Sequence, residues 1–298
     1  MAFKIAYGAG HYLQTAGKRL PKKLDASQTR EWTLNDRVAR HFAAAAAEYE
    51  NVELLRVDDP TGKTEVSLST RCKRANDWGA DFCLAIHHNA GVNLGSGGGI
   101  CAFSYKEGTK AAEYRDEIYD ACIAAGGLKG NRSDPTLTAN FYVLMYTKAP
   151  AVLMEYGFMD STTDAPVILT DAYSKLVAYA TMAGIAKAAG LKRKAAQPVK
   201  EQTAATANKA TAEIKAKNSA RYFNRGLAGT YTVTASALNV RHGAGITNSV
   251  MVTIPRGTAV KCYGYYSTFF GANWLYVQFD YKGTTYTGFA SAAYLKKA

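Results

Sequence analysis

The chain has 298 residues, enough for two domains of ordinary size, and 48% of them are hydrophobic, as is usual for globular proteins. Its formal net charge of +12 favours polyanionic surroundings such as nucleic acid, anionic lipid or anionic cell-wall polymers. Its five cysteines include no C-x-x-C pair, which excludes an obvious disulfide framework or cysteine-bound zinc and favours synthesis in a reducing compartment.

The N-terminal residues lead directly into the first predicted strand. They show no charged n-region, long apolar segment or small-residue cleavage site of a signal peptide. The longest apolar stretches fall short of the roughly 20 residues that cross a bilayer. We therefore expect synthesis in the cytoplasm without a signal peptide, no membrane partner, and access to any external target only through a pore or on lysis.

Residues 1–190 alternate apolar strands with helical patterns. Strands are predicted at 3–7, 52–56, 82–87, 99–104, 141–145 and 152–155, and helices at 29–49, 68–78, 109–125 and 174–189. This alternation predicts an α/β domain with a twisted, mostly parallel sheet covered by helices.

The composition changes at residue 191, where Ala, Thr, Lys and Gln replace most large apolar residues. Residues 191–228 are therefore predicted to be a linker without a core of its own. Residues 229–298 are rich in Tyr, Thr, Val and Gly and contain short strand patterns separated by glycine turns. This second pattern predicts a small all-β barrel.

Three strand ends in the first domain carry residues that can bind a metal or move a proton. His11 follows the glycine turn after the first strand, and His87 and Glu155 stand at the ends of two others. Functional groups gather at the carboxyl ends of strands in open α/β sheets, and imidazole is the commonest metal ligand, so these positions predict one shared site. His88 points to the opposite face from His87 and is expected to pack or to support the site.

A catalytic zinc takes three protein ligands and leaves one position for water, so a third ligand is needed. Glu31 is the best candidate, because it lies on the same inner stripe of its predicted helix as Leu34 and Val38, where an unpaired carboxylate is costly to bury. Simpler explanations exist for each residue alone. His11 fits a surface turn, Glu31 a favourable charge at a helix N-terminus, and Glu155 an exposed strand end. The joint arrangement favours the metal site.

These segments resemble the zinc-dependent N-acetylmuramoyl-L-alanine amidases of the amidase-3 family. That family has a Gly-His after its first strand, a glutamate at the start of its first helix, a Thr-Arg…Ala-Asp…Ile-His-x-Asn signature and a Pro-x-x-Leu-x-Glu-x-Gly-Phe strand. The matching residues here are Gly10-His11, Glu31, Thr70-Arg71, Ala80-Asp81, Ile86-His87-His88-Asn89 and the segment from Pro150 to Phe158. The chain departs from the family in having Tyr7-Gly8-Ala9-Gly10-His11-Tyr12 in place of Asp-Pro-Gly-His-Gly, although Gly10 and His11 themselves match.

The resemblance covers roughly residues 1–190 and implies that His11, Glu31 and His87 bind Zn²⁺ and that Glu155 is the catalytic carboxylate. It implies hydrolysis of the amide bond between N-acetylmuramic acid and L-alanine in peptidoglycan. In this chemistry Glu155 takes a proton from zinc-activated water and returns it to the departing amine.

The second domain, residues 229–298, is similar to bacterial SH3-type domains. The segments that carry the likeness are Leu238-Asn239-Val240-Arg241, Ile254-Pro255-Arg256-Gly257, Trp274-Leu275-Tyr276-Val277 and Gly288-Phe289-Ala290. This resemblance implies binding to the cell wall, and aromatic residues in excess of what a small core can bury are compatible with it. The basic charge could add attraction to anionic wall polymers.

The leading interpretation is a phage or prophage endolysin that lyses its host. Alternatives are a host autolysin with the same chemistry, a zinc carboxypeptidase that cuts the stem peptide, and a non-catalytic or DNA-associated protein that uses the positive charge. No predicted helix combines clustered Lys and Arg with base-reading residues, so no nucleic-acid partner is expected.

Overall fold

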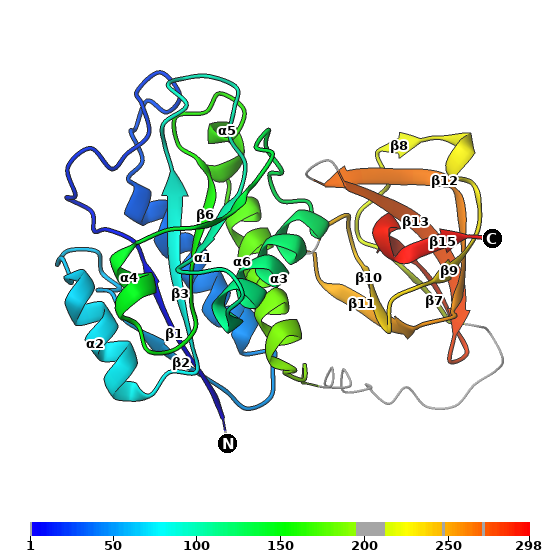
Figure 1. Cartoon of the computed structure of the whole chain (residues 1–298). Helices are drawn as coiled ribbons and strands as arrows, with labels where there is room; N and C mark the ends of the chain where they lie inside the picture. The colour runs from blue at the N-terminus through cyan, green and yellow to red at the C-terminus, as the bar shows by residue number, and fades with distance from the viewer. Residues whose placement is uncertain (1, 195–211, 246–247, 270–271) are drawn as a thin grey trace. The chain divides into compact units, whose positions relative to one another are not determined.

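The structure, a computed structural model, describes residues 2–194, 212–245, 248–269 and 272–298. The chain divides into two compact units, Met1–Ala195 and Ala196–Ala298 (Figure 1). None of the described helices combines the length and the apolar character that a membrane span requires.

A six-stranded mixed sheet forms the centre of the N-terminal unit, in the order β2-β1-β3-β6-β4-β5. Its strands are β1 (Phe3–Ala9), β2 (Val52–Arg56), β3 (Phe82–Asn89), β4 (Cys101–Ser104), β5 (Thr136–Thr138) and β6 (Ala151–Phe158). Strands β2, β1, β3 and β6 are parallel, whereas β4 is antiparallel to β6 and parallel to β5. This agrees with the predicted, mostly parallel α/β sheet, except that β4 and β5 at one edge run in the opposite direction to the other strands.

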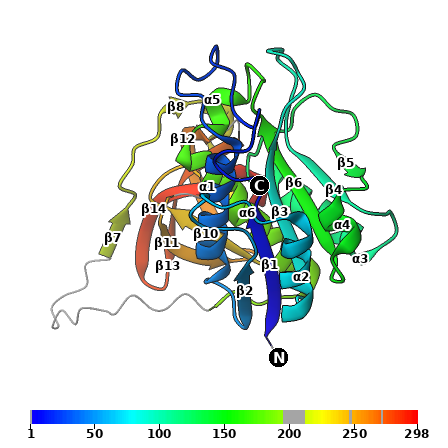
Figure 2. The same ribbon diagram turned by 90° about the vertical axis from the view of Figure 1, so that its left-hand side faces the viewer.

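Helices cover the two faces of this sheet unequally. On one face α1 (Glu31–Ala46), α3 (Lys110–Ala124) and α6 (Asp171–Ala189) pack together, and the short α5 (Ala165–Ile168) packs beside α6 and β6. On the other face lie α2 (Leu68–Trp78) and the single turn α4 (Tyr142–Tyr146), as Figure 2 shows. The α2–α4 face is the one onto which Cys83, Ala85 and His87 of β3 project.

Polar caps set the ends of three helices. The side chains of Ser67, Thr109 and Thr170 each accept a hydrogen bond from a backbone N–H in the first turn of α2, α3 and α6, respectively. Gly79 and Gly190 end α2 and α6 in the left-handed conformation that glycine adopts without strain.

The strand predicted at 141–145 is wrong, because this segment forms helix α4. Its aromatic and β-branched residues favour strands, but β4 and β6 pair directly through Cys101 and Glu155 and leave no place between them. The segment instead crosses the α2–α4 face as one helical turn. Leu144 is buried in the core, and the side chain of Asn76 in α2 donates a hydrogen bond to the Tyr146 carbonyl.

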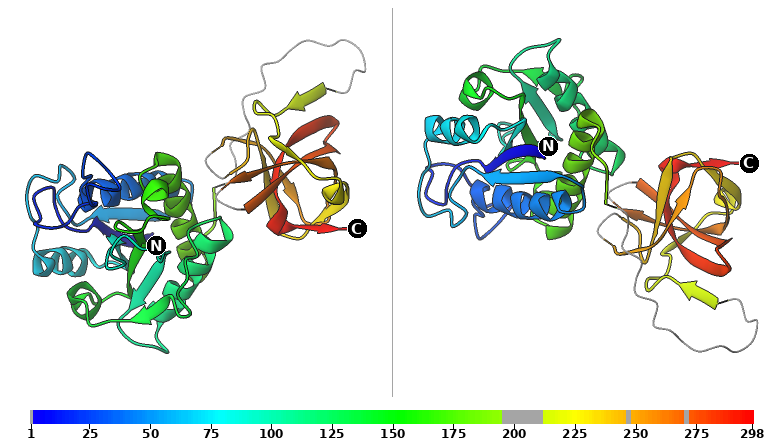
Figure 3. Two further views of the ribbon diagram at one scale, coloured as in Figure 1. Left: turned by 90° about the horizontal axis from the view of Figure 1, so that it is seen from above. Right: turned by 90° about the horizontal axis from the view of Figure 1, so that it is seen from below.

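The C-terminal unit is a nine-stranded sheet in the order β11-β10-β14-β13-β12-β9-β15, with β7 paired to β14 and β8 paired to β12. Figure 3 shows the strands of this unit in yellow to red. The strands are β7 (Ala212–Lys215), β8 (Tyr222–Phe223), β9 (Gly229–Val233), β10 (Ala237–Arg241), β11 (Val250–Pro255), β12 (Ala259–Phe269), β13 (Ala272–Tyr281), β14 (Thr284–Ser291) and β15 (Leu295–Lys297). Every described pairing is antiparallel except that of β7 with β14. The unit is all-β except for two 3₁₀ turns, and its SH3-type identity stays a prediction.

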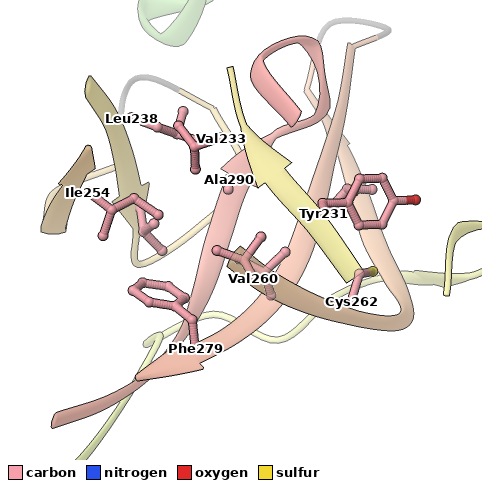
Figure 4. Close-up of a cluster of buried hydrophobic side chains, with 11 residues drawn as sticks. Tyr231, Val233, Leu238, Ile254, Val260, Cys262, Phe279 and Ala290 are labelled. Atoms are coloured by element: carbon pink, nitrogen blue, oxygen red, sulfur yellow. The ribbon is translucent and has the colours of Figure 1, made fainter. Parts of the chain in front are cut away.

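Side chains from most of these strands fill one apolar core (Figure 4). Val240, Ile254, Leu275 and Val277 are fully buried in it. The Trp274 ring is also buried, so it is not one of the aromatic rings that a ligand could reach at the surface. This core is separate from that of the N-terminal unit, which gives each unit its own source of stability.

The predicted linker of 191–228 is too long at both ends. The Glu50 amide donates to the Lys192 carbonyl, which attaches residues up to 194 to the N-terminal unit. At the other end β7 and β8 join the C-terminal sheet through backbone pairing. Ile214 and Phe223 remain exposed, so these strands lack the buried apolar residues by which a strand can be predicted from sequence. Residues 195–211 of the predicted linker lie outside the described residues.

Candidate active site

The first two candidate ligands lie side by side because β1 and β3 are neighbours. The Gly10 amide donates to the Ile86 carbonyl at 2.8 Å, which carries the pairing of these strands up to the two histidines. A Cβ on Gly10 would lie 2.0 Å from Cε1 of His87, so only glycine fits there. The rings of His11 and His87 lie 5.1 Å apart, and His11 has a left-handed φ of 64°.

The third candidate ligand, Glu31, is brought to the strand ends by the loop that precedes α1. Its amide donates to the Lys18 carbonyl at 3.1 Å, and a β-bridge joins Arg19 to Arg30. Leu20 in the same loop is fully buried and anchors it. Glu31 is therefore the first residue of α1, and its carboxylate is 1% exposed.

His11, Glu31 and His87 form a group that can hold a metal ion. One ligand atom from each lies within 4.8 Å of the others, and no second group of this kind occurs among the described residues. Nδ1 of His87 lies 3.1 Å from Oε1 of Glu31, and Nε2 of His11 lies 3.2 Å from Oε2. Oε2 is buried and has no hydrogen-bond partner in the described structure. An unsatisfied buried carboxylate oxygen facing imidazole nitrogens fits a metal ligand set.

The charges of this group favour an ionised glutamate. Burial alone would raise the pKa of Glu31, but the two imidazoles that face its oxygens outweigh burial and hold the pKa well below its usual range. Burial lowers the pKa of His87 and outweighs the nearby carboxylate. A neutral histidine beside an ionised carboxylate is the protonation state in which both can donate lone pairs to a cation.

Glu155 stands next to this group, on the strand beside β3. It is paired in register with His87 across β3 and β6. Its Oε2 atom is buried and has no hydrogen-bond partner among the described residues. Burial, and secondly the charge of Glu31, raise the pKa of Glu155 well above its usual value. A carboxyl group with a raised pKa holds a proton more strongly, which suits a group that transfers one.

Two supporting residues received no role in the sequence analysis. Arg71 is buried, and its guanidinium donates to the carbonyls of Ala9, His11 and Val66, so it fixes the turn that carries His11. Its place in the Thr70-Arg71 segment is a signal only through the family resemblance.

Asn35 lies one helical turn after Glu31 and is fully buried. It donates to the Gly10 carbonyl at 3.2 Å and contacts Nδ1 of His88 at 2.8 Å. The i, i+4 spacing from Glu31 is the signal that could have found it. His88 is buried on the face opposite His87, where burial lowers its pKa to about 3, as expected for a supporting residue.

A cavity of about 200 Å³ adjoins the two histidines on the α2–α4 face. Arg71, Cys83 and Ala85 form part of its wall, and Val143 and Thr147 of the α4 segment form another part. The side chains of His11 and His87 are 22% and 18% exposed, so a ligand in this cavity could reach them.

Comparison with known protein families identifies the family to which the N-terminal unit belongs. Residues 7–187 match the family model of the N-acetylmuramoyl-L-alanine amidases of type Amidase_3. The chain belongs to this amidase family. The matched region contains His11, Glu31, His87 and Glu155, and it stops before the C-terminal unit.

Two Bacillus relatives show the family likeness at the level of sequence. The chain is 37% identical over 169 residues to the N-acetylmuramoyl-L-alanine amidase CwlM of Bacillus licheniformis, a match that covers 56% of the chain. It is 35% identical over 173 residues to the sporulation-specific N-acetylmuramoyl-L-alanine amidase of Bacillus subtilis, with 57% of the chain covered. The matches cover 62% and 64% of these relatives, so the chain spans less than two thirds of their lengths.

Solved structures support the amidase fold of the N-terminal unit. The amidase of Clostridium difficile 630 aligns with a TM-score of 0.57 and 23% identity, covering 63% of this chain and 97% of that one. The catalytic domain of CwlV from Bacillus (Paenibacillus) polymyxa aligns with a TM-score of 0.55 and 20% identity, covering 64% and 99%. At these identities the likeness establishes the fold alone.

Proposed function

We propose that this chain hydrolyses the amide bond between N-acetylmuramic acid and L-alanine in bacterial peptidoglycan, with Zn²⁺ held by His11, Glu31 and His87. The observation that carries the proposal is the convergence of these three residues, with Glu155 in register beside them, inside the region that matches the amidase family. Bound Zn²⁺ would supply Lewis-acid activation of water and of the scissile carbonyl.

The protein's own groups account for the rest of the chemistry. The Glu155 carboxylate accepts the proton of the attacking water and later delivers it to the amine of L-alanine. Arg71 and Asn35 hold the backbone around His11 and Gly10, which keeps the ligands in place through the cycle. The cavity on the α2–α4 face provides room for the substrate beside the two histidines.

Mass spectrometry of digested cell walls tests the bond that is cut. Cleavage by an amidase releases stem peptides with a free L-alanine amine and leaves the lactyl group of the sugar as a free acid. Products shortened within the peptide would instead indicate the zinc carboxypeptidase. Treatment with a chelator should remove about one zinc per chain, measured by elemental analysis, and added zinc should restore cleavage. Full cleavage by verified zinc-free protein would contradict the metal site.

Glu155→Gln separates proton transfer from metal binding. Because Glu155 is assigned to proton transfer, the variant should keep its zinc content while turnover falls about 10²–10⁴-fold. Glu53→Gln, at an exposed position on the edge strand β2, is the matched control and should leave both unchanged. Loss of zinc from Glu155→Gln would mean that Glu155 is a ligand.

We also propose that the C-terminal unit binds the cell wall. It exposes aromatic residues on the paired strands β8 and β12, namely Tyr222, Phe223, Tyr263 and Tyr265. Residues 212–298 hold ten Lys and Arg but only two acidic residues, which suits an anionic wall. We further propose that the chain reaches the wall as an endolysin, through a phage-encoded pore; the alternative is an autolysin that is released when the cell lyses. Expression of the chain in its host with and without a pore-forming protein distinguishes the two routes.

A further inference from the structure

Exposed apolar side chains are distributed unevenly over the N-terminal unit. In the described part of this unit, residues 2–194, the large apolar side chains that are exposed all lie at the start of α2, directly after β4, or at α4. They are Leu68, Tyr105, Phe141, Tyr142, Met145 and Tyr146. Helices α1, α3 and α6 on the opposite face expose none. An exposed apolar surface at α4, with none on the helices of the opposite face, indicates a binding surface.

Four of these side chains, Phe141, Tyr142, Met145 and Tyr146, form what we call the α4 surface. Tyr146 is 55% exposed, and its ring lies 4.3 Å from that of Tyr142, one helical turn earlier. Neither tyrosine hydroxyl has a hydrogen-bond partner among the described residues. The two rings pack on each other and present their exposed parts and their free hydroxyls to a ligand.

The α4 surface is held firmly in place. Leu144 is buried in the core. Asn76 of α2 forms hydrogen bonds with the backbone at the end of the turn. Nδ2 of Asn76 donates to the Tyr146 carbonyl at 3.0 Å, and Oδ1 of Asn76 accepts from the Lys148 amide at 2.8 Å. Rings on a fixed turn lose little conformational entropy when they bind a ligand.

The cavity beside the two histidines extends to the segment that carries the α4 surface. Val143 and Thr147, which belong to the same segment, line the cavity that reaches His11 and His87.

The absence of charged residues in this segment indicates which part of a peptidoglycan substrate it can bind. Residues 135–147 contain no Asp, Glu, Lys, Arg or His. The stem peptide carries free carboxylates, whereas the sugar backbone is neutral wherever its lactyl group is joined to a peptide. Pyranose rings present C–H faces that pack on aromatic rings, and their hydroxyls can bond to the tyrosine hydroxyls.

We propose that the α4 surface binds the sugar chain of the substrate, on rings beyond the muramic acid whose amide bond is cut. The proposal rests on the proposed function, since it assumes a peptidoglycan substrate. It makes α4 a specificity element that favours long sugar chains over isolated muramoyl peptides.

Two soluble substrates test this in the full-length, zinc-loaded protein. One is a muramoyl peptide with a single sugar, and the other is a chain of several disaccharide units that carries the same peptide. Tyr142→Ala combined with Tyr146→Ala should raise KM for the long chain about tenfold. It should leave kcat, and all kinetics on the single-sugar substrate, unchanged.

Two further variants serve as controls. Tyr146→Phe keeps the ring and should keep most of the binding. Tyr119→Ala, a half-buried tyrosine on α3 at the opposite face, should change neither substrate's KM. Unfolding midpoints close to that of the wild type would show that the α4 variants are folded.

Four outcomes are decisive. A KM increase confined to the long chain supports the proposal. Equal losses on both substrates would overturn it and assign the α4 surface to the stem peptide or to the reacting unit, and no change on either would overturn it as well. Failure of the wild type to cut either substrate at the muramoyl–alanine bond would reject the proposed function, independently of α4.

Discussion

Gly10 makes the metal-binding group possible by having no side chain. Its φ is ordinary, so the requirement for glycine is steric: a Cβ would lie 2.0–2.4 Å from three atoms of the His87 ring. The close approach of the β1 and β3 ends, which brings His11 to His87, therefore depends on the space at this one position.

Gly10→Ala should consequently disable the site and leave the fold intact. The methyl group must push the His87 ring away, and a displacement of about 1 Å can cost roughly 100-fold in activity. Zinc content should fall in parallel, measured by elemental analysis after dialysis against weak chelator. Gly97→Ala, where a Cβ would come no closer than 3.3 Å to the Asn131 side chain and 3.6 Å to that of Val92, is the control. Wild-type zinc content in Gly10→Ala would contradict the steric argument.

The residues that could be predicted from sequence are those that end strands or begin a helix. His11 and His87 stand out because a polar ring directly after an apolar run is unusual, and Glu31 because it shares a stripe with core residues. Arg71 could not be found in this way, since it acts through backbone carbonyls of residues about 60 positions earlier. Contacts of this kind depend on tertiary structure and leave no local pattern.

At the scale of elements, the loop between His11 and Glu31 decides whether the third ligand reaches the strand ends. Asp25 organises this loop. Its Oδ1 accepts hydrogen bonds from the Ser27 hydroxyl at 2.6 Å and the Ser27 amide at 3.1 Å, and its Oδ2 accepts one from the Thr29 amide at 2.6 Å. Hydrogen bonds from the Ser27 and Thr29 side chains, and then from their backbone, lower the pKa of Asp25 to about 2.

Asp25→Asn should destabilise the protein in a pH-dependent way. The folded-state pKa lies below the unfolded value, so the carboxylate contributes stability above about pH 4 and loses it as the pH falls towards 2. Because Asp25 is mostly solvated, we expect about 1 kcal/mol at neutral pH, less than the full pKa difference implies. Urea unfolding at pH 7 and at pH 3 measures the change. The difference from wild type should shrink at pH 3, whereas exposed Asp134→Asn should show no such trend.

Element type could be predicted wherever burial followed a regular period. The 52–56 strand and the 68–78 helix have the predicted bounds, and α1, α3 and α6 agree with their predicted helices to within a few residues at their ends. Helix α4 could not be predicted, because the direct pairing of β4 with β6 overrides its local preference for a strand. Strands β7 and β8 were not predicted, because they join their sheet through backbone hydrogen bonds and leave Ile214 and Phe223 exposed.

At the scale of the whole molecule, the positive charge is divided unequally between the two units. Residues 1–194 hold 24 basic and 21 acidic residues, and residues 212–298 hold ten basic and two acidic residues. The C-terminal unit thus carries most of the net charge in less than half the length. The N-terminal unit, which has the candidate active site, is nearly balanced. This division suggests that chemistry and attraction to an anionic wall reside in different units.

Separate fragments test this division of labour. Each unit has its own core, so fragments 1–194 and 212–298 should both fold, which circular dichroism and cooperative unfolding can verify. The first should cut soluble muramoyl peptides but sediment poorly with purified walls, and the second should bind walls without cutting them. Salt separates the two sources of wall binding. Binding by charge should weaken as salt rises, because the Debye length falls from about 10 Å at 0.1 M to about 3 Å at 1 M.

Residual binding of 212–298 at 1 M salt would be carried by its exposed aromatic rings, and Phe223→Ala with Tyr265→Ala should remove it. Equal wall binding by both fragments, lost alike in salt, would contradict a dedicated binding unit and leave charge as the only means of targeting.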